Sequence, residues 1–228
     1  MSRLLQVTTS TRQRIVCGLI ALLTFVGITV GVATGALTGL DQSVAGAAAR
    51  HRLPWLYWVA RAGFSLGQNW MFPLISTVLA LVLAVRRRTL RPLLAVAGVF
   101  VVQYLVVGAA KVWAGRRPPA SGDPRLHAVT AELAQRISFP SGHAANIVVY
   151  SAVVGLLLAA LTGQPRWTTR LLGIGAASVA ICVGCMLYLG FHWTTDAAAG
   201  LALGIALRCA LAPAFAAALG RQPAYSRG

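Results

Sequence analysis

The chain has 228 residues, of which 57% are hydrophobic and only 11% are charged. This composition excludes an ordinary soluble domain, in which about a quarter of the residues are charged. The formal net charge of +16 does not indicate nucleic-acid binding, because the sequence has no basic helix face or aromatic-studded polar segment to carry it. We therefore expect no nucleic-acid partner.

Uncharged apolar stretches recur along the whole chain. They cover, in order, residues 15–40, 62–85, 92–110, 144–165, 171–191 and 197–207, and the last continues past Arg208 to Leu219. A bilayer span needs about 20 such residues, so the sequence predicts six transmembrane helices. Gln68 and Asn69 indicate that the second span begins near Trp70. The expected fold class is an all-α, polytopic membrane helix bundle.

One membrane domain, residues 15–220, accounts for nearly the whole chain. Residues 1–14 and 221–228 are expected to be tails, and residues 112–142 a long loop. Loops of that length usually form a lid or a site. We also expect residues 42–69, which are rich in tryptophan and tyrosine, to form a loop along the membrane surface.

Arginines are distributed unevenly between the two sides of the predicted bundle. The side of the N-terminus carries twelve arginines and no acid: Arg3, Arg12, Arg14, Arg86, Arg87, Arg88, Arg91, Arg166, Arg170, Arg208, Arg221 and Arg227. The opposite side carries all four acids, Asp41, Asp123, Glu132 and Asp196. Because positive charge marks cytoplasmic loops, we expect both termini to be cytoplasmic, in a multi-pass protein of the cell (inner) membrane.

Glycines recur every four residues in two of the predicted spans. They are Gly27, Gly31, Gly35 and Gly39 in the first, and Gly200 and Gly204 in the last. Small residues at this spacing let helices approach closely in lipid, so we expect helix packing at both sets. Asp196 is in register with the second set and is therefore expected to point into the bundle.

Polar residues that could bind a ligand or take part in catalysis lie at the ends of the spans. Lys111, Arg116 and Arg117 follow the third span, His143 begins the fourth, and His192 and Asp196 lie between the fifth and sixth. Because spans alternate in direction, all of these ends meet at one face of the membrane. The arginine count predicts that this face is extracytoplasmic.

The run Pro140-Ser141-Gly142-His143 is typical of an anion site at a helix start. Ser141 is a favoured N-cap, and Gly142 lets the backbone approach a ligand. The first N–H groups of the fourth helix and its positive dipole end would then face the anion. Lys111 and an arginine add charge suited to a phosphate.

His192 and Asp196 have the spacing of an oriented nucleophile. A carboxylate four residues after a histidine can hold the imidazole in one tautomer and make it more nucleophilic. His143 could then protonate a leaving oxygen. The sequence thus predicts a site that binds and moves a phosphoryl group.

These motifs resemble those of the type 2 phosphatidic acid phosphatases, which share a core with bacterial acid phosphatases and vanadium haloperoxidases. The family pattern is K-x6-R-P, then P-S-G-H, then S-R-x5-H-x3-D. Here P-S-G-H is intact, and H-x3-D is present as His192 and Asp196. The resemblance covers about residues 60–205. It implies a membrane phosphatase acting on a lipid-linked phosphate monoester or diphosphate, of the polyprenyl or glycerophospholipid class.

The resemblance also implies roles for individual residues. His192 would form a phosphohistidine, His143 would be the general acid, and Asp196 would orient His192. The phosphoryl oxygens would be held by Lys111, by Arg116 or Arg117, and by the backbone at Ser141 and Gly142. No metal or cofactor would be needed, and the four acids of the chain are scattered, whereas two-metal phosphatases need clustered carboxylates.

The sequence departs from the family pattern at two motifs. The first is one residue short, so either Arg117 or Arg116 takes the place of the family's arginine. In the third, Cys185-Met186 replaces serine-arginine, which removes one cation. Losing one charge-assisted contact costs on the order of 1.5–3 kcal/mol. Arg116, Arg125 and Arg136 are the candidates to replace that cation.

Two further functions use the same residues. One is a non-catalytic protein that binds or carries lipid phosphates and has lost an arginine. The other is phosphoryl transfer to an acceptor other than water. The expected partners are in every case a lipid phosphate and membrane lipids. The Cys182-x-x-Cys185 pair lies within an apolar stretch, so we expect it to serve in packing rather than in redox or metal chemistry.

Overall fold

The structure, a computed structural model, describes residues 10–119 and 137–220. Within these residues every regular element is a helix, so the expected all-α fold is confirmed. The elements are α1 (Thr11–Ala33), α2 (Thr38–Arg50), α3 (Pro54–Phe64), the 3₁₀ turn η1 (Ser65–Gly67), α4 (Met71–Arg87), α5 (Arg91–Ala114), α6 (Gly142–Thr162), α7 (Arg166–Leu189) and α8 (Thr194–Gly220). Most of both tails, and Arg125 and Arg136 of the long loop, lie outside the described residues.

The predicted membrane spans are present among these helices. In the described part of the chain, α1, α5, α6, α7 and α8 are each long and apolar enough to cross a bilayer. The unit from α3 to α4, bent by 43° at its break, makes a sixth if it is counted as one span. Trp70 is the N-cap of α4, as Gln68 and Asn69 indicated.

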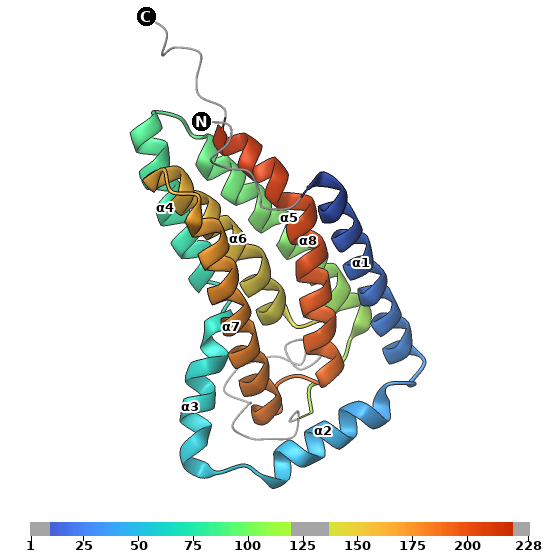
Figure 1. The fold of residues 1–228 in the computed structure, drawn as a ribbon. Helices are drawn as coiled ribbons and strands as arrows, with labels where there is room; N and C mark the ends of the chain where they lie inside the picture. Colours follow the sequence, from blue (N-terminus) through green and yellow to red (C-terminus); the bar gives the residue numbers. More distant parts are fainter. Residues whose placement is uncertain (1–9, 120–136, 221–228) are drawn as a thin grey trace, which may run out of the picture.

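Helix α6 forms the centre of the bundle and is buried along most of its length between α4, α7 and α8 (Figure 1). Glycines bring its neighbours close. A Cβ built on Gly155 would lie 3.1 Å from the Trp167 carbonyl oxygen of α7, and one on Gly204 of α8 would lie 2.9 Å from the Ala145 Cα. The expected close packing of the last span is therefore confirmed, and Asp196 is fully buried.

The glycines of the first span do not pack as expected. Among the described residues, no atom lies within 4 Å of a Cβ built on Gly27 or Gly39, and Gly35 adopts a φ of 76° that ends the helix. The first span therefore stops at Ala33 instead of reaching residue 40. Gly18 makes the close contact instead, because its Cβ would lie 3.1 Å from Cβ of Cys209 on α8.

The prediction of a surface loop over residues 42–69 is wrong, because these residues form most of α2, all of α3 and η1. The first part is rich in alanine, the best helix former, and Pro54 occupies the first turn of α3, where proline is tolerated. Figure 1 shows α2 crossing one end of the bundle and α3 running beside α7, on which it packs.

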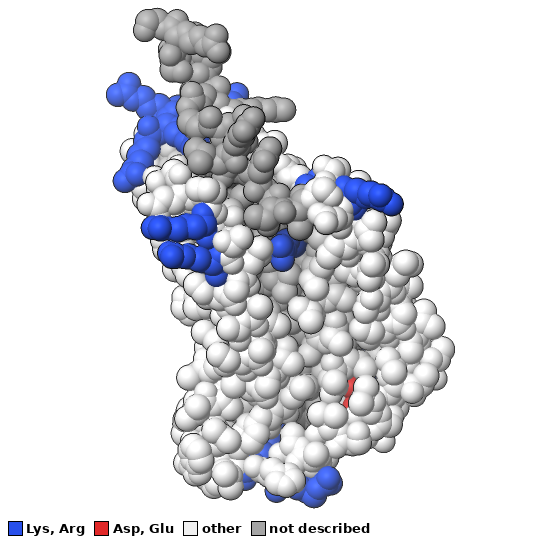
Figure 2. Space-filling model, in the orientation of Figure 1, with Lys and Arg blue, Asp and Glu red and all other residues white. Residues whose placement is uncertain are grey.

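Basic side chains are concentrated at one end of the molecule. In Figure 2 most blue side chains gather at the upper end, where α4 leads to α5 and α6 leads to α7, and a smaller group lies at the lower end. The exposed arginines of these connections are Arg86, Arg88, Arg91 and Arg166. This agrees with the uneven distribution read from the sequence, while the cytoplasmic orientation of that end stays a prediction.

Candidate active site

The structure brings the predicted site residues together at the lower end of the bundle. His143 begins α6, and His192 lies in the turn between α7 and α8. Their ring centroids are 6.2 Å apart, with an angle of 64° between the ring planes. We call these two residues the histidine pair. At this separation one phosphoryl group can contact both rings.

The start of α6 is fixed against α8 and α5. The Ser141 hydroxyl caps the helix by accepting a 3.4 Å hydrogen bond from the Ala144 N–H, and the Ser141 N–H donates to the Asp196 carbonyl oxygen at 2.9 Å. Gly200 of α8 lies directly against the Ser141 carbonyl oxygen. A side chain at Gly200 would therefore force the two helix starts apart.

Lys111 reaches the same helix start from α5. A Cβ built on Gly142 would lie 3.5 Å from Lys111 Cε, and the ammonium group donates to the Ile137 carbonyl oxygen. The positive charge therefore lies beside the N-terminal turn of α6. A lysine next to a helix N-terminus is an arrangement that attracts phosphate.

His192 is held near a buried carboxylate. Its Nδ1 lies 3.5 Å from Oδ2 of Asp196, which is longer than a hydrogen bond of about 2.7–3.2 Å. The same Oδ2 accepts a 2.9 Å hydrogen bond from the Trp193 N–H. Because Nδ1 is the nitrogen turned toward the carboxylate, Nε2 is the nitrogen left for chemistry.

His143 is held by packing. The Phe64 ring stacks on it with centroids 4.1 Å apart and an angle of 27° between the planes. Gly67 of η1 presses on it so closely that a Cβ there would lie 2.9 Å from the His143 Cα. The Nε2 atom of His143 is buried and has no hydrogen-bond partner among the described residues.

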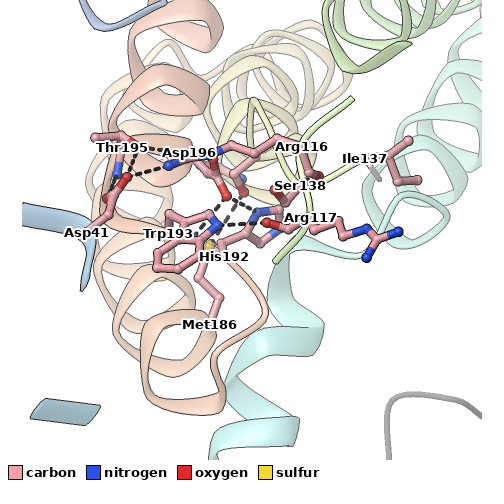
Figure 3. A network of polar contacts seen from close by, with 12 residues as sticks. Asp41, Arg116, Arg117, Ile137, Ser138, Met186, His192, Trp193, Thr195 and Asp196 are labelled. Carbon is pink, nitrogen blue, oxygen red and sulfur yellow. Dashed lines mark hydrogen bonds and ion pairs between the residues drawn. The ribbon is translucent and has the colours of Figure 1, made fainter. Parts of the chain in front are cut away.

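A cluster of charged and hydroxyl groups lies beside the histidine pair (Figure 3). Its members, which we call the acid cluster, are Asp41, Arg116, Thr195 and Asp196. The Arg116 guanidinium bonds Asp196 at 2.7 Å and Asp41 at 2.6 Å, and it donates to the Thr195 hydroxyl at 2.7 Å. Asp41 also accepts from the Thr195 N–H at 3.0 Å and from its hydroxyl at 2.6 Å.

The backbone around Arg116 is fixed as well. Both the N–H and the hydroxyl of Ser138 donate to the Arg116 carbonyl oxygen, each at 3.0 Å. The guanidinium lies 5.3 Å from the Trp193 ring centroid, and the indole N–H donates to the Arg117 carbonyl oxygen at 2.7 Å. The two ends of the long loop are thereby tied to each other and to the start of α8.

The two arginines of the first motif have different surroundings. Arg116 is paired with two buried carboxylates, whereas the Arg117 side chain is exposed and points away from the acid cluster (Figure 3). This arrangement favours a positioning role for Arg116 and leaves Arg117 available for a ligand. Which of the two contacts a phosphate stays a prediction.

Met186 occupies the position of the family's third-motif arginine. It is fully buried, and its sulfur lies 3.5 Å from the Ser141 hydroxyl. The thioether thus packs beneath the start of α6. In the adjoining turn, Cys182 is buried and Cys185 packs against Gly63 of α3.

Metal ligands are not grouped in the described part of the chain. No set of three or more His, Cys, Asp or Glu side chains is placed there to hold an ion. The expected independence of metals and cofactors stays a prediction.

Sequence reasoning missed several residues of the site. Asp41, Trp193 and Thr195 all bond to the first motif or to Asp196, and Phe64 stacks on the general-acid candidate. One signal could have identified Asp41. It is one of only four acids and directly follows an apolar stretch, where an acid is costly unless it is paired.

Comparisons with known proteins identify relatives of this chain. The family model of the PAP2 superfamily matches residues 92–218. The chain is 29% identical over 185 residues to phosphatidylglycerophosphatase B of Bacillus subtilis, covering 80% of this chain and 87% of that protein. It also matches the crystal structure of a transmembrane PAP2 type phosphatidylglycerolphosphate phosphatase from Bacillus subtilis. The TM-score is 0.71 and the identity 26%, over 85% of this chain and 93% of the other.

Proposed function

Because the chain belongs to the PAP2 superfamily and is a membrane-embedded lipid phosphatase, we propose that it hydrolyses a phosphate monoester or diphosphate through a phosphohistidine intermediate. The lipid would be a glycerophospholipid, as the name of the Bacillus relative states for that protein, or a polyprenyl lipid. The observation that carries this proposal is the pair of imidazoles 6.2 Å apart beside a helix N-terminus and Lys111.

In the first step, Nε2 of His192 attacks phosphorus. A nitrogen–phosphorus bond forms, the bond from phosphorus to the lipid oxygen breaks, and His143 gives a proton to the departing oxygen. Asp196 faces Nδ1 of His192, so its charge stabilises the imidazolium that develops. The buried, unpartnered Nε2 of His143 is the atom suited to carry the transferred proton.

In the second step, water completes the hydrolysis. Its oxygen attacks phosphorus, its proton passes to His143, and the bond from phosphorus to His192 breaks to release inorganic phosphate. Throughout both steps Lys111 and the Gly142 N–H hold the phosphoryl oxygens, where negative charge increases in the transition state. The Ser141 N–H, which the sequence also suggested for this role, instead donates to the Asp196 carbonyl oxygen. Arg117, with its exposed side chain, is suited to add a further cation from the loop.

The proposed location is the bacterial cell membrane, with the site on the extracytoplasmic face. Support comes from the arginines at the end of the bundle opposite the histidine pair, because cytoplasmic loops carry the excess of positive charge. A cysteine-accessibility assay tests this assignment. A cysteine introduced at Arg117 should react with a membrane-impermeant reagent in intact spheroplasts, and one introduced at Arg88 should not.

A second candidate function is a non-catalytic carrier of lipid phosphates. The observation that favours it is Met186, which leaves the start of α6 without the third-motif arginine of the family. A carrier would bind the lipid phosphate at the same residues and release it unchanged. Transfer of phosphate to an acceptor other than water would differ from hydrolysis only in its product, which product analysis identifies.

Phosphate release by purified protein distinguishes these functions. The substrates are phosphatidylglycerophosphate, phosphatidic acid and a polyprenyl diphosphate in detergent micelles, and His192→Ala should reduce the rate by about 10³-fold or more. His51→Ala is the matched control, because His51 is exposed at the end of α2 and its ring contacts the Ala47 carbonyl oxygen within its own helix, far from the histidine pair in the sequence. Acid-labile phosphate should be trapped on the wild type but not on His192→Ala, and EDTA should not reduce the rate. Equal rates for the wild type and His192→Ala would end the enzymatic proposal.

A further inference from the structure

A cavity of about 320 Å³ lies beside the proposed phosphate site, between α4, α5 and α6. Lys111 and Gly142 line its end at the site. Gln103 and Tyr150 line it farther into the bundle, because each lies about 12 Å along its helix from Lys111 and Gly142, respectively. A single water molecule occupies only about 30 Å³ in the liquid, so the cavity is large enough for a short segment of a lipid.

Hydrogen bonds fix the orientation of the amide groups in the cavity wall. The Gly67 carbonyl oxygen can only accept, so the atom of Asn146 that lies 3.4 Å from it is the amide nitrogen. The same nitrogen donates to the Asn69 side-chain oxygen at 2.5 Å. The Asn146 oxygen is therefore the acceptor for Gln103, which donates its own amide nitrogen. This leaves Oε1 of Gln103 as an acceptor.

Two polar atoms of this wall have no partner. Gln103 is 4% exposed and Tyr150 is 1% exposed, and among the described residues neither Oε1 of the first nor the hydroxyl of the second makes a hydrogen bond. Buried polar groups are almost always hydrogen-bonded in folded proteins, and leaving them unpaired is destabilising. Both residues line one cavity that starts at the phosphate site. They are therefore placed to bind a group attached to the substrate.

We propose that the cavity binds a hydroxyl group on the first few carbons next to the phosphate, and so selects glycerol-type phosphate esters that keep a free hydroxyl there over prenyl-type ones. This rests on the proposed phosphatase function. The hydroxyl donates to Oε1 of Gln103 and accepts from the Tyr150 hydroxyl. A prenyl chain has no hydroxyl, so its binding in the cavity would leave both buried groups unpaired.

A matched pair of substrates tests this selection. One is a monoacylglycerol phosphate, which carries a hydroxyl on the carbon beside the phosphate-bearing carbon. The other is an acyloxypropyl phosphate with the same acyl chain, which lacks only that hydroxyl. For the wild type we expect kcat/KM to be at least about 10-fold higher for the hydroxylated substrate.

Substitutions in the cavity should abolish this preference. Tyr150→Phe removes one hydroxyl, and Gln103→Leu removes the acceptor; in each variant the ratio of the two kcat/KM values should fall toward one. Ser76→Ala is the control, because the Ser76 hydroxyl on α4 is also buried without a partner among the described residues but does not line the cavity. Its ratio should equal that of the wild type.

Both kcat/KM values are measured on one preparation of each variant, so partial misfolding lowers both alike and leaves their ratio unchanged. If Gln103→Leu does not fold, Tyr150→Phe alone provides the test. A wild-type ratio near one would overturn the selection, and so would a ratio that both cavity variants leave unchanged. The latter is the result expected if a trapped water alone satisfies the two groups. Absence of phosphate release from every substrate, at wild-type folding, would instead contradict the phosphatase proposal itself.

Discussion

The acid cluster and the histidine pair lie at the same end of the bundle but differ in how their polar atoms are satisfied. In the acid cluster two buried carboxylates share one guanidinium, and the Thr195 hydroxyl bonds to both Asp41 and Arg116. In the histidine pair, Nε2 of His143 and Nδ1 of His192 are buried without a hydrogen bond within the described residues. Saturated groups fix the backbone. Of the two unsaturated nitrogens, Nε2 of His143 is the one left for a substrate, because Nδ1 of His192 faces Asp196.

Removing Arg116 should have the largest effect on stability, because it removes the cation that both carboxylates of the acid cluster share. Arg116→Met leaves Asp41 and Asp196 buried without their cation, which costs about 3–5 kcal/mol in the free energy of unfolding. We expect a large drop in the thermal midpoint, measured by size exclusion of heated, detergent-solubilised protein, together with loss of phosphatase activity.

A double variant sharpens this prediction. Adding Asp41→Asn to Arg116→Met removes one of the two unpaired charges, so the midpoint should recover part of its loss. If the double variant is less stable than Arg116→Met, the unpaired buried charge is not the cause of the lost stability.

A substitution of His143 tests the histidine pair, in which two buried nitrogens have no hydrogen-bond partner within the described residues. His143→Gln should lower kcat by about 10²–10⁴-fold, the usual contribution of a general acid. The unfolding midpoint should change little, because Nε2 gives up no hydrogen bond within the described residues. A variant whose activity falls only in proportion to its folded fraction would show that His143 serves packing against Phe64 instead.

A smaller effect is expected where the two clusters are joined. Gly200→Ala would push a methyl group into the Ser141 carbonyl, and overpacking of this kind costs about 1–3 kcal/mol. Gly98→Ala on α5 is the control, since no atom in the described part of the chain lies within 4 Å of a Cβ there. We expect Gly98→Ala to leave the thermal midpoint unchanged or raise it. Equal midpoints for the two variants would contradict the close contact.

The smallest effect on stability is expected at Arg117. Arg117→Gln replaces an exposed side chain, so the free energy of unfolding should change by no more than about 0.5 kcal/mol. If Arg117 contacts the substrate phosphate, KM should rise by about 10-fold or more, since a hydrogen bond to a charged group is lost. An unchanged KM would assign the phosphate contact to another residue.

The spans and their common end could be predicted from sequence, because hydropathy and the alternation of spans are local properties of the chain. The bent unit of α3 and α4 and the surface helix α2 could not. Aromatic and polar residues in 42–69 are equally compatible with a surface loop and with surface helices. Only contacts with α7 and α8 distinguish the two, and these are distant in sequence.

The motif residues of the site could be predicted for the same reason, since His143, His192 and Asp196 begin or precede helices whose directions are fixed by the spans. Their polar partners could not. Asp41 bonds to a guanidinium 75 residues away, and the orientation of the Gln103 amide depends on a carbonyl of η1. No periodicity along the chain reports such pairings. The role of Arg116 likewise becomes visible only when both carboxylates are seen beside it.

The packing of α1 on α8 has a consequence for biosynthesis. Helix α1 contacts chiefly α8, which is far later in the sequence, so it must wait in the lipid until α8 has been synthesised. Many leucine and isoleucine side chains of α1 remain exposed even in the finished fold, so lipid can solvate the helix before its partner is present. Packing of α1 is therefore completed only after α8 has been made, and a chain stopped before residue 194 leaves α1 without its main helix partner.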